Sequence, residues 1–296
     1  MSWYLGVVSD EISQDLEEAL RGAVELNLAY VELGSVWGRS VTSLEREEVA
    51  RARRLLAEYG LRVNMIAAPT FKVVILDEDS PPFAQWPEYQ EHRQMLTRSI
   101  EIALELEAPL VRTFSFRRPG MVGFGNPSPR LPKGGPLPQP IADRIVEALG
   151  LAAEECQKAG LTLALENVRS CWGNTGENAA KIVDAVGSPA LKMVWDPTNT
   201  FVSGGVDYPD GFAAVRGRIC DVHVKDASLL DAESGLTRWE CVGRGEVRWP
   251  EQVAALKADG YFGPFTIETH WQPEDGSNGT AATTAAFRQI LAALGS

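Results

Sequence analysis

The stretch ICDVHVKD, residues 219–226, alternates like a buried β-strand but carries ionisable side chains on one face. Its apolar positions alternate with Asp221, His223 and Lys225. Because successive side chains of a strand point to opposite faces, these three groups would share one face. Burying them is costly unless other groups compensate their charge. The stretch therefore predicts a strand whose polar face meets other charged groups inside the fold.

Seven further stretches read as short strands. With 219–225, the predicted strands are 4–9, 30–34, 62–67, 110–116, 161–167, 191–197 and 264–270. Apolar residues recur at helical spacing in 15–28, 44–60, 88–108, 141–160, 175–187, 249–260 and 284–294, and more weakly in 210–217. Eight strand–helix units in 296 residues predict an α/β protein, a single (β/α)₈ TIM barrel with residues 1–296 as one domain.

Composition narrows the classes of function. The net charge of −12 argues against a surface for nucleic acid or an anionic membrane. The four cysteines have neither paired-zinc spacing nor the density of a disulfide framework. We see no signal-peptide pattern in MSWYLGVVSDEIS and no apolar run of about 18 residues, so we expect a cytoplasmic protein with no membrane span.

Two long loops follow predicted strands, 68–85 and 117–140. The second has seven prolines, five glycines and four basic residues without an acid. Loops that follow barrel strands lie at the C-terminal mouth of the barrel, where the active sites of barrel enzymes are found. For 117–140 we consider a lid, a contact within a homo-oligomer and a mobile surface loop.

Four consecutive predicted strands each end in a side chain that can bind a metal ion. These are Glu166, Asp196, His223 and Glu268. Apolar residues flank each of them, so strand periodicity turns the apolar neighbours toward the helices and the four polar groups into the barrel. We therefore expect the four side chains to converge at the mouth.

Three carboxylates and an imidazole suit a hard or borderline divalent ion. Mn²⁺ is the first choice, with Mg²⁺, Co²⁺, Fe²⁺ and Zn²⁺ as alternatives. Without an ion, the converging carboxylates would repel one another and their pKa values would rise. The alternative for the same residues is a salt-bridged barrel interior.

Strand parity also suggests internal ion pairs. Lys225 would lie one layer above His223 and hold a substrate oxygen, or else pair with Asp226 or another acid. Lower in the barrel we expect a pair between Asp221 and Lys192. A similar pair is expected between Glu32 and Arg112.

The motifs LALEN, VWDPTN, VHVKDA, VGRGEVRW and GPFTIETH resemble, in order and spacing, the xylose isomerase-like TIM-barrel superfamily. Within it, the chain resembles the sugar isomerase/epimerase branch, with tagatose 3-epimerase-like, hydroxypyruvate isomerase and inosose-processing enzymes. The resemblance covers essentially the whole chain and is most specific in its second half. It implies one divalent ion bound by Glu166, Asp196, His223 and Glu268. It also implies that the two glutamates are acid/base catalysts on either side of the substrate.

The chain departs from the pattern at Asn199, where several relatives carry a substrate-facing or metal-binding histidine. Apurinic endonucleases of the superfamily hold three zinc ions with several more histidines. This chain has only His92, His223 and His270, so the resemblance does not extend to DNA repair.

The expected reaction is isomerisation or epimerisation of a sugar, keto-sugar or polyol-derived ketone through an enediolate. If the enediolate instead expels a β-hydroxyl, the same residues make a dehydratase of an inosose- or dehydroshikimate-like substrate. Cleavage of a sugar conjugate and a non-catalytic sugar-binding barrel are further alternatives.

Several other residues are candidates for contact with a small carbohydrate-like substrate. Lys225, Arg244 and His270 would form a cationic rim above the metal, and Asn199 would face the substrate. Aromatic residues in predicted loops after strands would stack on a sugar ring or pack within the protein; these are Trp37, Phe71, Trp172 and Trp271.

Overall fold

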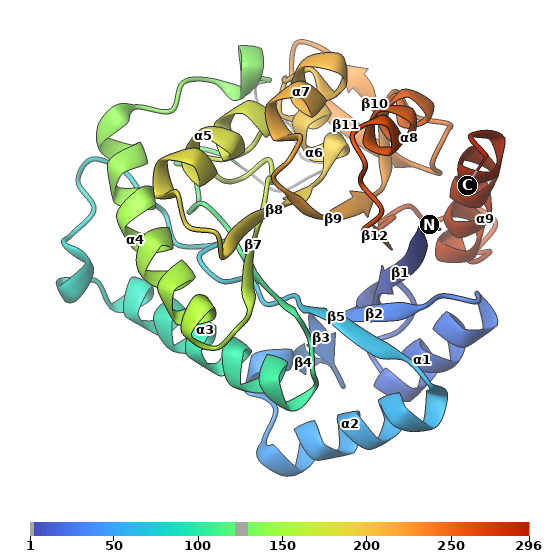
Figure 1. Ribbon diagram of the computed structural model, residues 1–296. Coiled ribbons are helices and arrows are strands. Elements are labelled where there is room, and N and C mark those ends of the chain that lie inside the picture. Colours follow the sequence, from blue (N-terminus) through green and yellow to red (C-terminus); the bar gives the residue numbers. More distant parts are fainter. Residues whose placement is uncertain (1–2, 122–129, 296) are drawn as a thin grey trace.

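Eight parallel strands close into a barrel in the computed structural model, which describes residues 3–121 and 130–295 (Figure 1). The strands are β1 (Tyr4–Val8), β2 (Tyr30–Leu33), β5 (Arg62–Ile66), β6 (Leu110–Thr113), β7 (Thr162–Glu166), β8 (Leu191–Trp195), β9 (Ile219–Val224) and β12 (Pro264–Ile267). Around the barrel their order is β1-β12-β9-β8-β7-β6-β5-β2. The predicted barrel is confirmed, and each strand begins within one residue of its predicted start.

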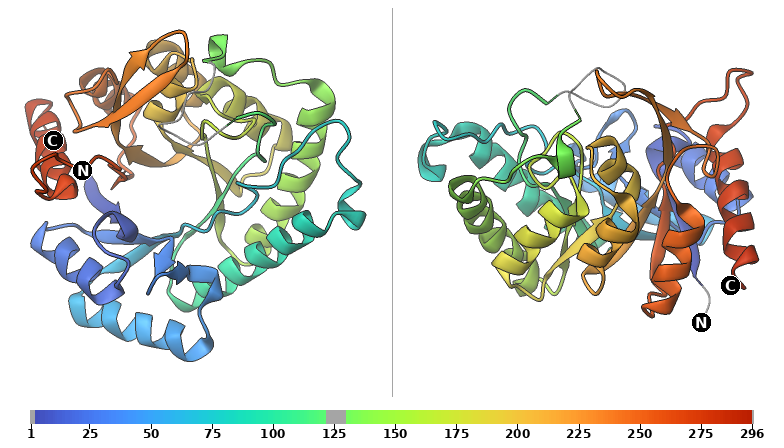
Figure 2. Two further views of the ribbon diagram at one scale, coloured as in Figure 1. Left: turned by 180° about the vertical axis from the view of Figure 1, so that it is seen from behind. Right: turned by 90° about the horizontal axis from the view of Figure 1, so that it is seen from above.

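Helices surround the barrel, and the two ends of the chain lie on the same side of it (Figure 2). The helices are α1 (Leu16–Glu25), α2 (Arg46–Tyr59), α3 (Pro87–Glu105), α4 (Gln139–Lys158), α5 (Gly176–Val186), α6 (Pro197–Val202), α7 (Phe212–Val215), α8 (Trp249–Ala258) and α9 (Gly279–Ala293). Capping residues determine where two of these helices begin and end. The Asp15 side chain caps α1 by accepting from the Glu18 N–H at 3.1 Å, and Gly60 ends α2 in a left-handed conformation.

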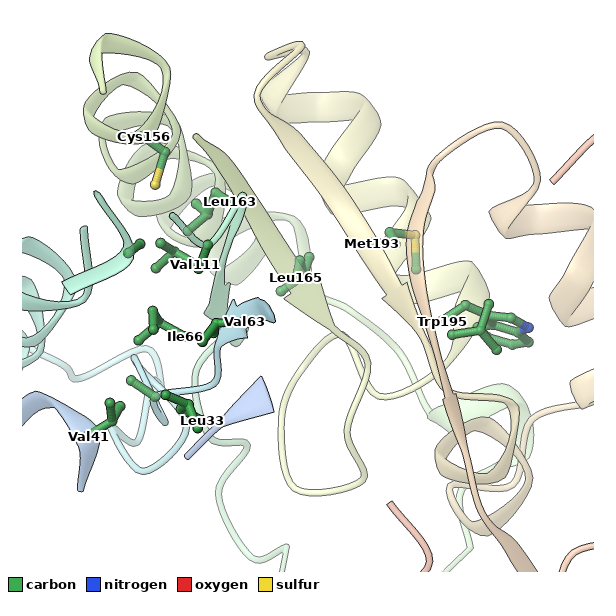
Figure 3. Close-up of a cluster of buried hydrophobic side chains, with 14 of the residues drawn as sticks. Leu33, Val41, Val63, Ile66, Val111, Cys156, Leu163, Leu165, Met193 and Trp195 are labelled. Atoms are coloured by element: carbon green, nitrogen blue, oxygen red, sulfur yellow. The ribbon is translucent and has the colours of Figure 1, made fainter. Parts of the chain in front are cut away.

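Apolar side chains fill two separate places. Outward-facing residues such as Leu163 and Leu165 of β7 pack beneath the helices in the main core, where Cys156 of α4 joins them (Figure 3). A smaller cluster belongs to the strands themselves and comprises Met65, Leu110, Ala164 and Val194. Ala164 precedes Glu166 by two residues and Val194 precedes Asp196 by two, so each shares the face of the polar residue that follows it. An apolar layer therefore underlies the polar groups of the mouth.

Two hairpins were not predicted from the sequence. A short one comprises β3 (Ser35–Val36) and β4 (Arg39–Ser40), and a longer one comprises β10 (Asp226–Asp231) and β11 (Leu236–Glu240). The longer hairpin directly follows β9, where a helix was expected to follow after a loop. Its signal in the sequence is the turn segment 232–235, AESG, between the stretches ASLL and LTRW.

Asp226, at the start of β10, holds the loop 241–247. Its carboxylate accepts from four backbone N–H groups at 2.9 to 3.2 Å, those of Ala227, Gly243, Gly245 and Val247. Gly245 passes so close that an added Cβ would lie 2.2 Å from Asp226 Oδ1, which requires glycine there. Burial raises the pKa of Asp226 to about 6, and these N–H groups oppose that rise.

Replacing Asp226 by asparagine is expected to destabilise the fold. An asparagine keeps one acceptor oxygen and turns an NH₂ group toward two N–H donors. We expect the free energy of unfolding to fall by about 2–4 kcal/mol, since hydrogen bonds to charged groups are worth about 1.5–3 kcal/mol each. Urea denaturation measures this, with the exposed Asp210→Asn as control. Unfolding of D226N at the wild-type urea concentration would contradict the assigned role.

Part of the loop 117–140 lies outside the described residues, at 122–129. Its role as a lid, subunit contact or mobile loop stays a prediction. Before that gap, Arg117 forms isolated bridges with Ile75 and Cys171, which join the two long loops to each other and to the loop after β7. Across the described parts of the chain, none of the helices combines the length and apolar character needed to cross a membrane.

Candidate metal and active site

Four strand ends bring their last polar side chains together. In the group formed by Glu166, Asp196, His223 and Glu268, one potential ligand atom from each residue lies within 4.8 Å of all the others. All four side chains are buried. They belong to β7, β8, β9 and β12 or directly follow them, and these strands are neighbours in the barrel. The strand register thus produces the convergence that periodicity predicted.

Asp196 is fixed by the start of α6. The sequence WDP places Asp196 at the N-cap and Pro197 at the first helical position, as both residue types prefer. Asp196 Oδ1 accepts from the Asn199 N–H at 2.8 Å. Asn167, which directly follows β7, also fixes Asp196. Its side chain donates to the Asp196 carbonyl at 2.8 Å and accepts from the Asp196 N–H at 3.0 Å.

His223 has one nitrogen engaged and one directed at the carboxylates. Its Nε2 lies 3.2 Å from Glu32 Oε2. Its Nδ1 is buried without a hydrogen-bond partner among the described residues, 3.3 Å from Glu268 Oε2 and 3.8 Å from Glu166 Oε1. A carboxylate on Nε2 keeps that nitrogen protonated, so that Nδ1 is the nitrogen left for a metal ion. This buried nitrogen among three carboxylates fits a divalent ion.

The electrostatics of the group favour a cation. Burial raises the pKa of Asp196 to about 6, against the charge of Lys225. Burial also acts to raise the pKa of Glu268, but Lys225 and His223 outweigh it and hold this pKa well below its ordinary value. Burial would lower the pKa of His223, yet the charges of Glu32 and Glu268 raise it well above its usual range. The negative charge of the carboxylates thus stabilises positively charged groups beside them.

Lys225 is one of these positively charged groups. Its Nζ lies 2.7 Å from Asp196 Oδ2 and also pairs with Glu268 Oε2. The expected pair of Lys225 with Asp226 or another acid of the mouth thus forms with Asp196 and Glu268, and not with Asp226, which faces the backbone N–H groups described above. The ammonium of Lys225 thus contacts two of the four side chains that a metal ion would use.

We expect Lys225→Met to bind Mn²⁺ at least about 10-fold more tightly than the wild type. An ammonium and a divalent ion that share two carboxylates repel each other, and the repulsion between charges about 4 Å apart is several kcal/mol in a partly buried site. Calorimetric titration of the metal-free proteins measures the two dissociation constants. An unchanged or weaker affinity in K225M would show that Lys225 does not compete with the ion.

Arg112 contacts one carboxylate oxygen of each glutamate, the one that faces away from His223. Its Nη1 lies 3.2 Å from Glu166 Oε2 and 3.8 Å from Glu268 Oε1, whereas the other oxygen of each glutamate faces His223. Asn199 Nδ2 donates to Asp196 Oδ2 at 2.8 Å and to Glu166 Oε1 at 3.3 Å. Each glutamate is therefore oriented by contacts on both of its oxygens.

The two internal ion pairs expected lower in the barrel do not form among the described residues. Arg112 reaches Glu166 and not Glu32, while Glu32 contacts His223 and accepts from Thr266 Oγ1 at 2.7 Å. Arg112 also donates to the Ala67 carbonyl, and the register of β2 and β5 shifts between Val31 and Glu32, which strand periodicity does not predict.

Asp221 likewise has other partners than Lys192. Its Oδ2 accepts from Asn64 Nδ2 at 2.5 Å, and its Oδ1 lies 3.0 Å from Thr266 Oγ1, the hydroxyl that Glu32 also contacts. The register of β8 and β9 shifts between Met193 and Val194, which periodicity alone does not foresee. Burial, followed by the charge of Glu32, raises the pKa of Asp221 well above its ordinary value. Asp221 thus lies among Asn64, Thr266 and Glu32 rather than beside Lys192.

A cavity of about 220 Å³ opens above the four converging side chains. Its lining comprises Lys72, Glu166, Val168, Arg169, Ser170, Asn199, Lys225, Trp239, Glu268 and His270. Three of the proposed substrate contacts, Asn199, Lys225 and His270, are therefore at this cavity. Lys72, Arg169 and Trp239 were missed by sequence reasoning, because they lie on loops or on the unpredicted hairpin. His270 Nδ1 lies 2.6 Å from Glu11 Oε1.

Two other proposed contacts are elsewhere. Arg244 is exposed and lines a different cavity beside α9, together with Trp271, because the β10–β11 hairpin displaces its loop from the mouth. Trp172 is buried, and its Nε1 donates to the Leu76 carbonyl at 2.9 Å. Phe71 stacks on Phe116 in the core at a centroid distance of 4.7 Å. Of the four aromatic candidates, none lines the 220 Å³ cavity.

A larger cavity of about 560 Å³ lies at the opposite end of the barrel, where strands begin. It is lined by residues such as Tyr4, Arg62 and Pro109 and by none of the four converging side chains. The chemistry of the donor set, rather than cavity size, identifies the candidate active site.

Comparisons with known proteins agree with the fold. A family model described as "Xylose isomerase-like TIM barrel" matches residues 20–290. A D-allulose 3-epimerase from Methylomonas sp. is 18% identical with a TM-score of 0.69, covering 98% of each chain. A 3-keto-D-glucoside 4-epimerase from E. coli is 15% identical with a TM-score of 0.70, covering 97% of this chain and 100% of the other. A xylose isomerase-like TIM-barrel protein from Mycobacterium smegmatis in complex with magnesium is 18% identical with a TM-score of 0.67, covering 99% and 97%.

Proposed function

The chain belongs to the xylose isomerase-like TIM-barrel family, and from this premise we propose that it is a divalent-metal-dependent isomerase or epimerase of a sugar, keto-sugar or polyol-derived ketone. One observation carries the proposal. The side chains of Glu166, Asp196, His223 and Glu268 converge within 4.8 Å beneath a cavity. Relatives in fold include sugar 3- and 4-epimerases, which supports this reaction class.

The four residues would hold one divalent ion, with Mn²⁺ as our first choice. Such an ion supplies Lewis acidity that polarises a substrate carbonyl. His223 Nδ1 and the carboxylates provide nitrogen and oxygen donors of the required hardness. Glu32 would hold the His223 ring in place through Nε2.

The glutamates would move the proton. In this proposal one of Glu166 and Glu268 removes the proton next to the substrate carbonyl, leaving an enediolate. The other, which is protonated at the start of the step, returns its proton at the neighbouring carbon or on the opposite face. Arg112 contacts both carboxylates, so it would keep them oriented. Positioned acid/base groups of this kind typically contribute about 10²–10⁴-fold each.

Proton exchange in D₂O tests the reaction. With Mn²⁺-loaded protein and a panel of ketoses, inososes and keto-acids, an isomerase or epimerase incorporates deuterium into the recovered sugar. A dehydratase, the alternative that uses the same residues, yields an unsaturated product that absorbs in the ultraviolet. A substrate that binds without exchange or loss of water would support the non-catalytic sugar-binding alternative and overturn the proposal.

A further inference from the structure

A second cavity adjoins the candidate active site. This outer cavity has a volume of about 390 Å³ and is lined by residues 238–240 of β11 and by residues of the segment 270–274. Trp239 and His270 also line the cavity of about 220 Å³ above the four converging side chains, which we call the inner cavity. The inner cavity alone is smaller than the range of about 300–1,000 Å³ typical of small-molecule sites, whereas the two cavities together fall within it. The site thus has space for more than the unit that reacts.

Trp239 lies where the two cavities meet. Its ring centre is 5.6 Å from Lys225 Nζ, a group of the inner cavity, and 4.9 Å from the centre of the His270 ring. In the hairpin, Trp239 pairs with Ala227 of β10, directly after Asp226, whose carboxylate fixes the loop 241–247. The indole is therefore held at a place that a ligand extending from one cavity into the other must contact.

His270 adopts a left-handed backbone conformation, with a φ of 49°. Residues other than glycine keep such conformations where surrounding contacts impose them, and they cluster at functional sites. Here Glu11 supplies the contacts, since its Oε2 accepts from the His270 N–H at 2.9 Å and its Oε1 lies 2.6 Å from His270 Nδ1. The turn at His270 carries the chain from the proposed catalytic Glu268 to the lining of the outer cavity.

The groups that line the outer cavity fit a neutral sugar ring. Trp239 and Trp271 are partly buried and supply indole rings, whose apolar faces pack against the C–H face of a pyranose. Arg238 and Glu240 form an ion pair at 2.7 Å, and together they offer donors and acceptors to hydroxyl groups. Because Glu240 and Glu274 both line this cavity with Arg238, its charges do not favour an anion.

Resting on the proposed function, we propose that the substrate has two sugar rings, a keto-sugar in the inner cavity and a second, uncharged ring in the outer cavity, packed on Trp239 and Trp271. The hydroxyketone of the first ring lies over Glu166 and Glu268, and the link between the rings passes Trp239 and His270. The second ring takes no part in the proton transfer. Its contacts select a glycoside over a free monosaccharide.

Three ligands with the same fructose unit test the role of the outer cavity. D-fructose has no second sugar, whereas maltulose and isomaltulose carry a glucose ring on the fourth and the sixth oxygen of fructose. With the full chain in the presence of Mn²⁺, we expect the dissociation constant of the better disaccharide to be at least about 10-fold lower than that of fructose, as for the added stacking and hydrogen bonds of one ring. Calorimetry measures all three dissociation constants.

Trp271→Ala is expected to abolish most of this preference and to leave the affinity for fructose unchanged, because Trp271 lines the outer cavity and not the inner one. Trp271→Phe keeps an aromatic ring and should retain most of the preference. Trp37→Ala is the matched control, since Trp37 is also partly buried and lines neither cavity. Melting temperatures check that the variants fold.

Three results would overturn the two-ring substrate. In the first, neither disaccharide binds more tightly than fructose to the wild type. In the second, W271A keeps the wild-type preference, and in the third it weakens fructose and the disaccharide equally. The first comparison needs the wild type alone, so it decides the proposal even where W271A does not fold.

Deuterium exchange into each ligand is scored separately. Preference for a disaccharide without exchange keeps the role of the outer cavity and counts against the proposed reaction. Exchange into fructose without preference for a disaccharide keeps the reaction and removes the role of the outer cavity. The two proposals therefore fail independently.

Discussion

Glu166→Gln and Glu268→Gln are each expected to lower turnover at least about 10³-fold, because a glutamine cannot accept the substrate proton. The glutamine retains the size and one oxygen of the glutamate, so substrate binding should change far less than turnover. The expected pattern is therefore a lower kcat with a similar KM, typical of an interaction needed in the transition state.

The contacts of the two carboxylates make the substitutions informative. Glu166 and Glu268 each meet Arg112 with one oxygen and face His223 with the other. Since both glutamates are also proposed metal ligands, the bound Mn²⁺ of each variant is measured alongside its kinetics. Glu58→Gln, on the exposed face of α2, controls for the loss of one negative charge. A variant that keeps its ion and near-normal turnover would remove that residue from the acid/base pair.

Strand periodicity predicted the convergence of the four polar side chains, because regular structure determines their direction. Glu166, Asp196, His223 and Glu268 all occupy ends of parallel strands, and neighbouring strands of one barrel end at the same mouth. Two local rules, alternation along a strand and adjacency of consecutive strands, are enough to bring these four side chains together. The barrel itself follows from the same repeated pattern.

The same rules fail where the register shifts or where loops supply the residues. The irregularity between Met193 and Val194 changes which side chains of β8 and β9 lie level, and so Asp221 meets Asn64 instead of Lys192. Arg244 follows a hairpin that has no helical or barrel-strand pattern. Lys72 enters the cavity from a loop, whose path the sequence does not encode by periodicity.

Charge balance links the site to the composition of the whole chain. A protein with a net charge of −12 still gathers four cations, Lys72, Arg112, Arg169 and Lys225, in and around one cavity. Two of them, Arg112 and Lys225, pair with the carboxylates. Of the predicted cationic rim, Lys225 and His270 line the cavity and Arg244 lines another, and a role of the rim in substrate binding stays a prediction.

Removal of His223 or Asp196 is expected to eliminate tight metal binding. Wild-type protein refolded with Mn²⁺ should hold about one ion per chain, as mononuclear sites do, and His223→Ala and Asp196→Ala should hold less than about a tenth of that after dialysis. His223 supplies the one imidazole of the group, and Asp196 is held rigidly by α6. Elemental analysis gives the metal content, and chelation of the wild type should abolish turnover.

A third substitution is expected to weaken metal binding without eliminating it. Glu32 contacts His223 Nε2 from outside the group, so Glu32→Gln should retain the ion but bind it about 10–100-fold more weakly, as expected for a residue that orients a ligand. His270→Ala is the control, because His270 lines the cavity without belonging to the converging group, and it should keep its ion. A salt-bridged interior makes the opposite prediction. In that case the wild type takes up no Mn²⁺, and all four substitutions change stability alone.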